Sequence, residues 1–593
     1  SPERSVNLFE YKDAKAKHPT VLINTSGLVN QSLTFSGAAA TDPARMDFIF
    51  GANCYRVIGS RLFQIQNVAG TLATFSSGTI LTATGYIGVD ANSSQMMFVD
   101  GTYGWIYDDT NGLRQITDPG FPSSPVDVTY LDGFFVVANG GSNNFYLSQI
   151  NQGLIWGAFP TGPVTFSMAA LGTQMVVTGA ATTYLQIGTP FTVSGSTDTA
   201  RLANGLYYAL TVVSSTTITL SSTLGGAVIT ITAGAAVTGT LTRVGEAQIG
   251  AITSHPGNIV ACRTLHRKLF LFSDNYTEVW ENQGKGTNLP FRRNNGLLLE
   301  YGTPSADSIS TGFDFMLFLA QDAGGLGSVM QVSGSSVDPV STSALDYQLS
   351  VYARADEVSD ANGILIKENG MIFYRLNFTA ADHTFVYNVT QSTPNERMWH
   401  EEEVLNGTRH LAQTHAYFGG NNYVGAYNGS AWYKIDPEYY LNGTEKIRRM
   451  RITQPVTPPA GYRIKVHRLE LDLLQGSATN FIPTTENVFI LTEADELIET
   501  EDGTADLITE TPITYNVQET PYAFLSTSRD SGQTYGNVLR EQMGAVGERT
   551  YRTVWRKLGA FPRNQAFVPK IEFYNDAAFI ILGASWVYEI LPE

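Results

Sequence analysis

The sequence predicts an all-β protein: a β-propeller of about six to eight blades with an inserted small β domain and an acidic hairpin extension. The first supporting observation is composition. Only 15% of the 593 residues are charged and 43% are hydrophobic, whereas about a quarter of the residues in a typical globular domain are charged. The second is that short runs rich in Val, Ile, Tyr and Phe recur between Gly, Asn and Asp, without helical periodicity.

The third observation is the spacing of these runs. Each run contains an aromatic or apolar anchor, and the anchors are Tyr55, Trp105, Tyr146, Val279, Met330, Phe385 and Trp432. Their separations are about 50, 41, 133, 51, 55 and 47 residues, and all but the third are close to the period of propeller blades. The chain therefore repeats one structural unit, with one interruption.

The interruption coincides with a change of composition. The long interval exceeds a blade by roughly 80 residues, and residues 171–245 within it are dense in Thr and Ser and almost without charge. The stretch "YYALTVVSSTTITL" alternates in the way typical of strands. A disordered linker is the alternative, but the β-branched content favours a folded β domain inserted into the propeller.

A second change of composition occurs at 481–520, where acids surround "EDG" and apolar residues return every few positions. We predict an acidic hairpin extension there, which is either a solvated loop or an interaction arm. The predicted domains are an N-terminal arm with the first strands (1–40), the propeller in two parts (41–170 and 246–480), the inserted β domain (171–245), the acidic hairpin (481–520) and a last blade that closes the propeller (521–593).

Charge and cysteine content exclude several classes of protein. The formal net charge of -17 argues against a protein that coats nucleic acid, because such a protein shows a basic face. Cys54 and Cys262 lie far apart in apolar runs, which predicts buried thiols rather than a disulfide or a metal site. Residues 1–20 lack the apolar core of a signal peptide, and no apolar run is long enough for a membrane helix.

No motif predicts catalysis. The stretch "GKGT" (284–287) lacks the glycine spacing and the Lys-Ser/Thr pair of a phosphate-binding loop. His400 is followed by three acids but lacks a second histidine at metal-ligand spacing, and His410 and His415 lack an acid or cysteine partner. We therefore expect no catalytic residue, no cofactor and no metal, so the protein is predicted not to be an enzyme.

One short pattern resembles the Asp-box hairpin found on the blades of β-propellers, sialidases among them. Its residues are Ser528, Asp530, Gly532, Thr534 and Tyr535. The carboxylate accepts backbone N–H groups across the turn, and glycine supplies a positive φ. We predict a structural hairpin, because a sialidase would also need an arginine cluster, a tyrosine–glutamate pair and, usually, several such boxes.

Basic residues gather at 445–473, in two strand-like arms around a Pro-rich turn. The candidate contacts to another subunit or a partner are Lys446, Arg448, Arg451, Arg463 and Lys465. Two interpretations stay open: an exposed edge whose charges prevent aggregation, or a basic stripe that meets an acidic neighbour.

The stretch "RSVNLFEYKDAKAKHPTVLINTSGL" (4–28) is similar to the opening of the tail nozzle proteins of short-tailed bacteriophages, also called packaged DNA stabilisation proteins. The matching residues are Asn7, Leu8, Glu10, Pro19, Leu22, Thr25, Gly27 and Leu28. Segments 267–284, 445–452, 528–536 and 552–561 resemble later regions of that family in the same order. Ser26 stands where the family tends to have proline, and nothing is carried over to the insertions at 171–245 and 481–520.

The resemblance implies a virion structural protein: the hexameric nozzle of a podovirus-type tail, made in the host bacterial cytoplasm. It implies a DNA channel below portal and adaptor that retains the packaged genome and passes it at ejection. The implied partners are further copies of the chain, portal-adaptor proteins, tail fibre, spike or needle proteins, and genomic DNA bound without sequence specificity. A six-membered ring would carry about -100 formal charges, which disfavours adhesion of phosphates to an acidic wall.

Two other functions remain open at this point: a propeller-based receptor- or glycan-binding tail protein, and a cellular interaction propeller. Oligomeric state separates the three, because a nozzle predicts a six-fold particle, a receptor binder a three-fold one and a cellular module a monomer.

Overall fold

The computed structural model describes residues 3–592 apart from 14, 119, 157–163, 179–186, 189, 215, 244–247, 285–288, 335, 460, 479–481, 487–512, 518–520, 545–550 and 563–564. The chain divides into two compact units. The propeller unit comprises Asn30–Arg397 and Arg409–Lys434. The sandwich unit comprises Ser1–Val29, Met398–Thr408 and Ile435–Glu593.

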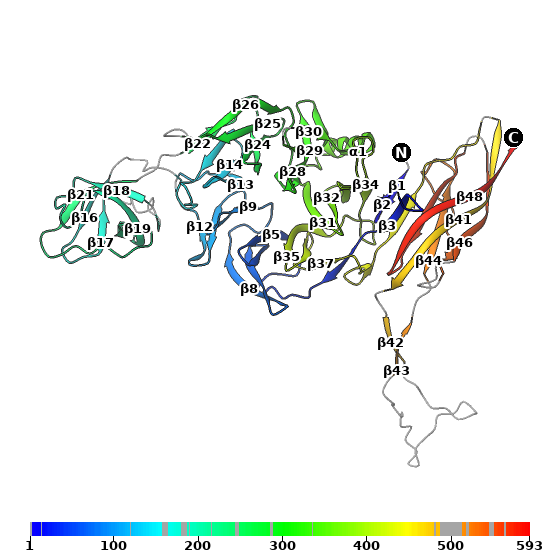
Figure 1. The fold of residues 1–593 in the computed structure, drawn as a ribbon, viewed down its shortest axis with the longest axis horizontal. Coiled ribbons are helices and arrows are strands. Elements are labelled where there is room, and N and C mark those ends of the chain that lie inside the picture. Colours follow the sequence, from blue (N-terminus) through cyan, green and yellow to red (C-terminus); the bar gives the residue numbers. More distant parts are fainter. Residues whose placement is uncertain are drawn as a thin grey trace, which may run out of the picture. The chain divides into compact units, whose positions relative to one another are not determined.

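Seven antiparallel blades form the propeller unit in its described residues, within the predicted range (Figure 1). The first five blades are four-stranded, and the first two consist of β5 (Ala44–Phe50), β6 (Asn53–Ile58), β7 (Arg61–Val68) and β8 (Thr71–Thr79), then β9 (Gly88–Ala91), β10 (Met96–Val99), β11 (Gly104–Asp108) and β12 (Gly112–Gln115). The third blade consists of β13 (Pro125–Leu131), β14 (Phe134–Asn139), β15 (Asn144–Leu147) and β22 (Gln248–Ala251). The fourth and fifth consist of β23 (Ile259–Leu265), β24 (Lys268–Ser273), β25 (Thr277–Asn282) and β26 (Phe291–Leu299), then β27 (Ser310–Gly312), β28 (Phe315–Asp322), β29 (Gly325–Ser333) and β30 (Ser336–Pro339). The last two contain β31 (Asn362–Glu368), β32 (Met371–Phe378) and β33 (His383–Asn388), then β35 (Ala412–Phe418), β36 (Asn421–Ala426) and β37 (Trp432–Asp436).

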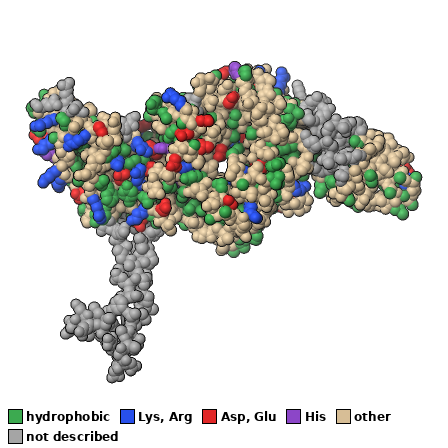
Figure 2. Space-filling view, turned by 180° about the vertical axis from the view of Figure 1, so that it is seen from behind, with side chains coloured by type: hydrophobic (Ala, Val, Ile, Leu, Met, Phe, Trp, Pro, Cys, Tyr) green, Lys and Arg blue, Asp and Glu red, His purple; other side chains and the backbone are tan. Residues whose placement is uncertain are grey.

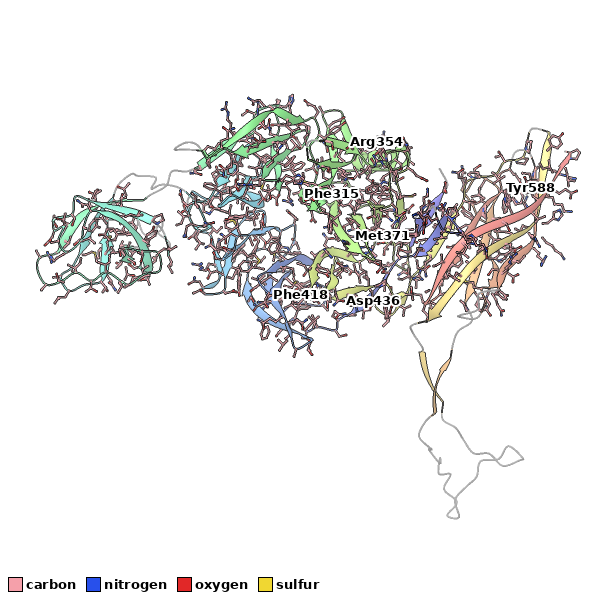
Figure 3. The ribbon with its side chains drawn as sticks, viewed as in Figure 1. Phe315, Arg354, Met371, Phe418, Asp436 and Tyr588 are labelled. Atoms are coloured by element: carbon pink, nitrogen blue, oxygen red, sulfur yellow. The ribbon has the colours of Figure 1, made fainter. Side chains whose placement is uncertain are left out.

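The first strand of each blade contacts the first strands of the two neighbouring blades, and β35 contacts β5, so these strands form a closed ring. Figure 3 labels Phe315, Met371 and Phe418, which come from three successive blades. Between blades, buried apolar side chains pack face to face; Phe272 and Phe318, for example, meet edge to face with ring centroids 5.1 Å apart. This packing is typical of propellers, whose blades bury their faces on one another.

Helical structure is sparse in the part of the chain that the structure describes. The helix α1 (Ser343–Arg354) follows β30, and the Thr342 side chain accepts a hydrogen bond from the Leu345 N–H at its start. A single 3-10 turn, η2, covers Ala306–Ser308. Within this described part, no helix is long and apolar enough to cross a membrane.

The inserted β domain is a closed six-stranded barrel. Its strands are β16 (Val164–Met168), β17 (Gln174–Val177), β18 (Pro190–Ser194), β19 (Gly205–Ser214), β20 (Thr217–Ser221) and β21 (Val237–Arg243). Pairing of β16 with β21 closes the barrel, so it begins before the predicted boundary at 171. Its interior is a separate cluster of buried apolar side chains that includes Phe166, Phe191 and Ile218.

Because the barrel has its own core, we expect the propeller to fold without it. Replacing residues 164–243 by a short flexible linker should change the free energy of unfolding of the propeller by no more than about 1 kcal/mol, since loop-closure entropy varies slowly with loop length. Circular dichroism and urea denaturation of the shortened and full chains measure this. Loss of cooperative unfolding in the shortened chain would contradict the barrel's independence.

Two sheets make up the sandwich unit. The first has the order β34 (Trp399–Glu401), β1 (Arg4–Val6), β40 (Arg449–Ile452), β47 (Val568–Phe573), β44 (Tyr522–Ser528) and β45 (Leu539–Gln542). The second has the order β2 (Leu8–Lys12), β3 (Thr20–Asn24), β48 (Ala577–Pro592), β41 (Tyr462–Ala478) and β46 (Arg552–Phe561). Leu525 and Phe573 of the first sheet share one buried cluster with Leu469, Trp555 and Phe579 of the second, so the sheets pack face to face.

This arrangement corrects two predicted boundaries. Residues 521–593 form strands of the sandwich unit instead of a last blade, and the second part of the propeller ends near Lys434 instead of at 480. The physical reason is strand length. β41 and β48 pair along most of their 17 and 16 residues, far beyond the strands of a blade, and they pack on the strands of the first sheet.

The remaining described strands are short. β4 (Gly27–Asn30) pairs with β38 (Leu441–Asn442), which pairs with β39 (Glu445–Lys446). In the predicted acidic extension, β42 (Ile482–Glu486) and β43 (Ile513–Val517) pair antiparallel. Residues 487–512 of that extension lie outside the described residues.

Candidate interaction surfaces

Three residues of types that enzymes use in catalysis, Cys54, Cys262 and His415, lie in surroundings that oppose their ionisation. Cys54 and Cys262 are free and 0% exposed, and burial raises the pKa of both thiols. Burial lowers the pKa of His415 to about 4, so its ring is neutral at pH 7 and shares a 3.0 Å hydrogen bond with Asn422. Among the described residues, no group of three or more His, Cys, Asp or Glu could hold a metal ion.

The five residues of the Asp-box pattern lie together in the β44–β45 hairpin, at the end of β44 and in the loop that follows it. Ser528 Oγ donates to Asp530 Oδ1 (2.7 Å) and accepts from the Gly532 N–H (2.8 Å). Asp530 accepts from the Thr534 N–H (2.8 Å) and hydroxyl (2.5 Å), and Gly532 has a φ of +96°. The Lys570 ammonium lies 4.8 Å from the centre of the Tyr535 ring.

Hydrogen bonds from Ser528 and Thr534 hold the pKa of Asp530 well below its usual range. A depressed carboxyl pKa stabilises the fold above the unfolded-state value of about 4, and this contribution disappears as pH falls through the folded-state pKa. We therefore expect Asp530→Ala to lower the Tm at pH 7. The same substitution should change the Tm much less at a pH close to the folded-state pKa of Asp530. The exposed Asp338→Ala is the matched control, and a Tm for Asp530→Ala equal to that of wild type at pH 7 would contradict the structural role.

The predicted basic contact residues separate into two groups. Arg448 Nε donates to Glu403 Oε1 (2.8 Å), and Arg451 Nη2 lies 2.5 Å from Glu3 Oε1 and 3.5 Å from Glu10 Oε1. These two arginines therefore hold strands of their own unit together. Their positions do not match the predicted role as contacts to a partner.

The other three predicted contact residues are more accessible. Arg463 and Lys465 are exposed on β41, and Lys446 is partly buried on β39. Only Arg463 and Lys465 thus remain fully available to a partner among the five predicted residues, and they lie near the end of the long β41–β48 pair.

A group of charged residues on the first strands of the blades was not predicted from the sequence. Asp127 Oδ2 on β13 accepts from the Cys262 N–H on β23 (2.9 Å) and pairs with Arg263, and its Oδ1 accepts from the Tyr86 hydroxyl (3.0 Å). Asp90 Oδ2 on β9 accepts from the Tyr130 N–H on β13 (2.6 Å). Each carboxylate therefore bonds to the neighbouring blade, and burial raises the pKa of both.

Hydrogen bonds around a second ion pair join the first and last blades, whereas the pair itself, Asp47 on β5 and Arg56 on β6, lies within the first blade. Arg56 Nη1 lies 2.9 Å from Asp47 Oδ2, and both side chains are 0% exposed. Arg56 Nη2 donates to the Ala431 carbonyl (2.9 Å), and the Thr414 hydroxyl donates to Asp47. A Cβ at Gly425 would lie 2.6 Å from Arg56 Nη1, so only glycine permits this approach.

A sequence signal for these residues exists. Asp47, Asp90, Asp127 and Arg263 are each a charged residue inside the apolar run that forms the first strand of a blade. A buried charge is retained when it is paired and hydrogen-bonded, so such positions indicate contacts between blades. Chemically the arrangement cross-links blades, and its carboxylates are occupied by hydrogen bonds within the chain.

Two family models match the chain. The model described as "Bacteriophage P22 Gp10, beta-propeller" matches residues 6–154 and 234–440. The model described as "Bacteriophage P22 Gp10, beta-sandwich" matches residues 479–586. The gap at 155–233 falls on most of the barrel, so the barrel is largely outside the family's common sequence. No curated protein sequence matches the chain.

The chain also matches solved structures of distant sequence. The Neurospora crassa Pan2 WD40 domain is 8% identical over 70% of this chain and 95% of its own, with a TM-score of 0.33. The phage phi92 endosialidase is 9% identical over 94% of this chain and 92% of its own, with a TM-score of 0.29. At these TM-scores neither likeness bears on function.

The matched residues include all seven blades of the propeller unit and most of the last strands of the sandwich unit, and together they cover more than half of the chain. All seven blades lie within the propeller match and β44–β47 lie within the sandwich match, although the propeller match also includes β2 and β3 of the sandwich unit. The chain belongs to the bacteriophage P22 Gp10 family and is a structural protein of the phage tail.

Proposed function

We propose that six copies of this chain form the tail nozzle of a short-tailed phage, below portal and adaptor, and that the ring retains the packaged genome until it passes at ejection. The observation that carries this proposal is family membership across both units. The ring of inter-blade bonds supports it, because a nozzle that contains pressurised DNA needs a wall that deforms little. The buried ion pair Asp127–Arg263 and the hydrogen bonds that Arg56 and Asp47 form with the last blade supply such links.

Charge also supports a passage for DNA. The net charge of -17 per chain disfavours tight binding of phosphates. Portal-adaptor proteins and tail fibre, spike or needle proteins are the proposed partners, and the proposed location is the virion tail.

Genetic removal tests this function. Particles assembled without the chain should release their DNA on mild heating or dilution, measured as nuclease-sensitive DNA, and expression of the wild-type chain in the host should restore retention. Images of the purified oligomer should show six-fold symmetry. Particles that lack the chain yet keep their DNA as firmly as complete virions would contradict retention, and a three-fold particle would favour a receptor-binding tail protein.

A further inference from the structure

The end of β48 is an open sheet edge. Gly583–Pro592 pairs with β41 on one side, from Asp472↔Gly583 to Tyr462↔Pro592. On the other side β3 pairs only with Ile580 and Ile581, before this segment begins. No strand among the described residues pairs with the rest of that edge, so a row of backbone N–H and C=O groups is open to another segment.

The side chains along this edge are mostly apolar and exposed, and its one acid, Glu589, lies 3.4 Å from His467. Val587, Tyr588 and Ile590 are 45%, 46% and 46% exposed. Tyr588 and Ile590 stand opposite Val466 and Ile464, which belong to the buried core, so they extend the core face outward. Tyr588 is labelled in Figure 3, near the free end of this strand. Natural sheets shield such edges with charge, proline or another segment. Another segment therefore fits along this edge.

Cations lie on β41 and β46, the two strands beyond the paired side of β48. Arg463 and Lys465 on β41, and Arg556 and Lys557 on β46, are exposed and form no ion pair with another described residue. Figure 2 shows Lys and Arg side chains gathered over this end of the sandwich unit. We call these four residues and the edge Gly583–Pro592 the basic edge. A segment that binds it must carry negative charge as well as apolar side chains.

The chain itself contains a segment of this composition. Residues 487–512 contain eight acids and no Lys, Arg or His, and apolar residues such as Leu497 and Ile498 lie between the acids. Contacts in a ring of identical copies are heterologous, which means that each joins two different surfaces. The basic edge and the acidic segment are two such surfaces with opposite charge.

We propose that the basic edge binds the acidic segment 487–512 of a second copy of the chain. The choice of a second copy rests on the proposed ring. The binding itself does not, so the two claims are tested separately.

The first experiment measures binding. The receptor is the chain with residues 487–512 replaced by a Gly-Ser linker, and the probe is a fluorescent peptide of residues 487–512. We expect saturable binding that weakens at least about tenfold between 50 and 500 mM salt, and at least about tenfold in Arg463→Glu/Lys465→Glu/Arg556→Glu/Lys557→Glu. Tyr588→Ser/Ile590→Ser, which changes no charge, should also weaken it, because the apolar edge contributes.

Matched controls separate this site from general charge attraction. Arg292→Glu/Lys367→Glu, on exposed residues of the propeller unit, should leave the affinity unchanged. A peptide of the same composition in scrambled order should bind less tightly. Equal binding of the scrambled peptide, or of the receptor with four reversed charges, would overturn the proposal, provided circular dichroism shows that the receptor is folded.

The second experiment identifies the source of the segment. In sedimentation velocity, the full chain with the four reversed charges should lose the oligomer that the wild-type chain forms. An unchanged oligomer despite weak peptide binding would show that the segment is bound within one copy, which overturns the contact between copies. If the wild-type chain is a monomer at all concentrations, the proposed ring fails while the peptide measurement stands.

Discussion

Replacing Arg56 with methionine is expected to lower the free energy of unfolding of the propeller unit by about 3–5 kcal/mol, because it leaves the buried Asp47 carboxylate without its charge partner. Both side chains are 0% exposed, and Arg56 also donates to Ala431 in the last blade. The first blade therefore loses an internal ion pair, and its contact with the last blade loses a hydrogen bond. Denaturant unfolding followed by tryptophan fluorescence measures the change.

The control for this prediction is the double variant Asp47→Asn/Arg56→Met. It removes both charges, so no uncompensated carboxylate remains, and it should be more stable than Arg56→Met alone. If the single variant is as stable as the double variant, the ion pair does not hold the ring closed.

Asp307→Asn is expected to stabilise the protein at pH 8 by about 2 kcal/mol and to leave stability almost unchanged near pH 4. Burial raises the pKa of Asp307 to about 7, and Arg263 and Arg409 oppose this only in part. Since the folded-state pKa lies above the unfolded-state value, ionisation between about pH 4 and 7 favours the unfolded chain. Asparagine carries no charge. Its side-chain oxygen can still accept a hydrogen bond from the Gln413 amide, which lies 3.3 Å from the carboxylate of Asp307.

The difference in Tm between wild type and Asp307→Asn, measured from pH 4 to pH 8, tests this expectation. Asp127 and Asp90, whose pKa values are also raised, remain in both proteins, so the difference isolates Asp307. A difference that is constant across this range would show that Asp307 titrates as an exposed aspartate does.

The propeller could be predicted from the sequence because each blade, apart from the one that the barrel interrupts, is local: its strands follow one another within about 50 residues and contain regularly spaced aromatic or apolar anchors. The Asp-box hairpin was also predictable, since Ser528 and Asp530 bond to residues no more than four positions away. Local patterns therefore specified both features.

The sandwich unit could not be predicted in this way. Arg451 pairs with Glu3, which lies 448 positions away. The residues next to Arg451 in the sequence therefore do not indicate that it forms an ion pair within its own unit. The anchor pattern ends at Trp432, and the sequence after it contains no pattern that predicts the pairing of β41 with β48. Pairings over such separations depend on the whole fold, which a single sequence does not display.

The two ends of the chain meet in one unit, and this affects the order of folding during synthesis. Strands β1 and β3 are made before the propeller, but they pair with β40 and β48, which are made after it (Figure 1). The propeller, whose pairings are mostly local, can therefore fold while β1 and β3 still lack their partner strands. A chain whose synthesis stops before Ala577 lacks β48 and leaves β3 with an unpaired edge. A chain without β48 therefore cannot complete the second sheet of the sandwich unit, even though its propeller has all of its strands.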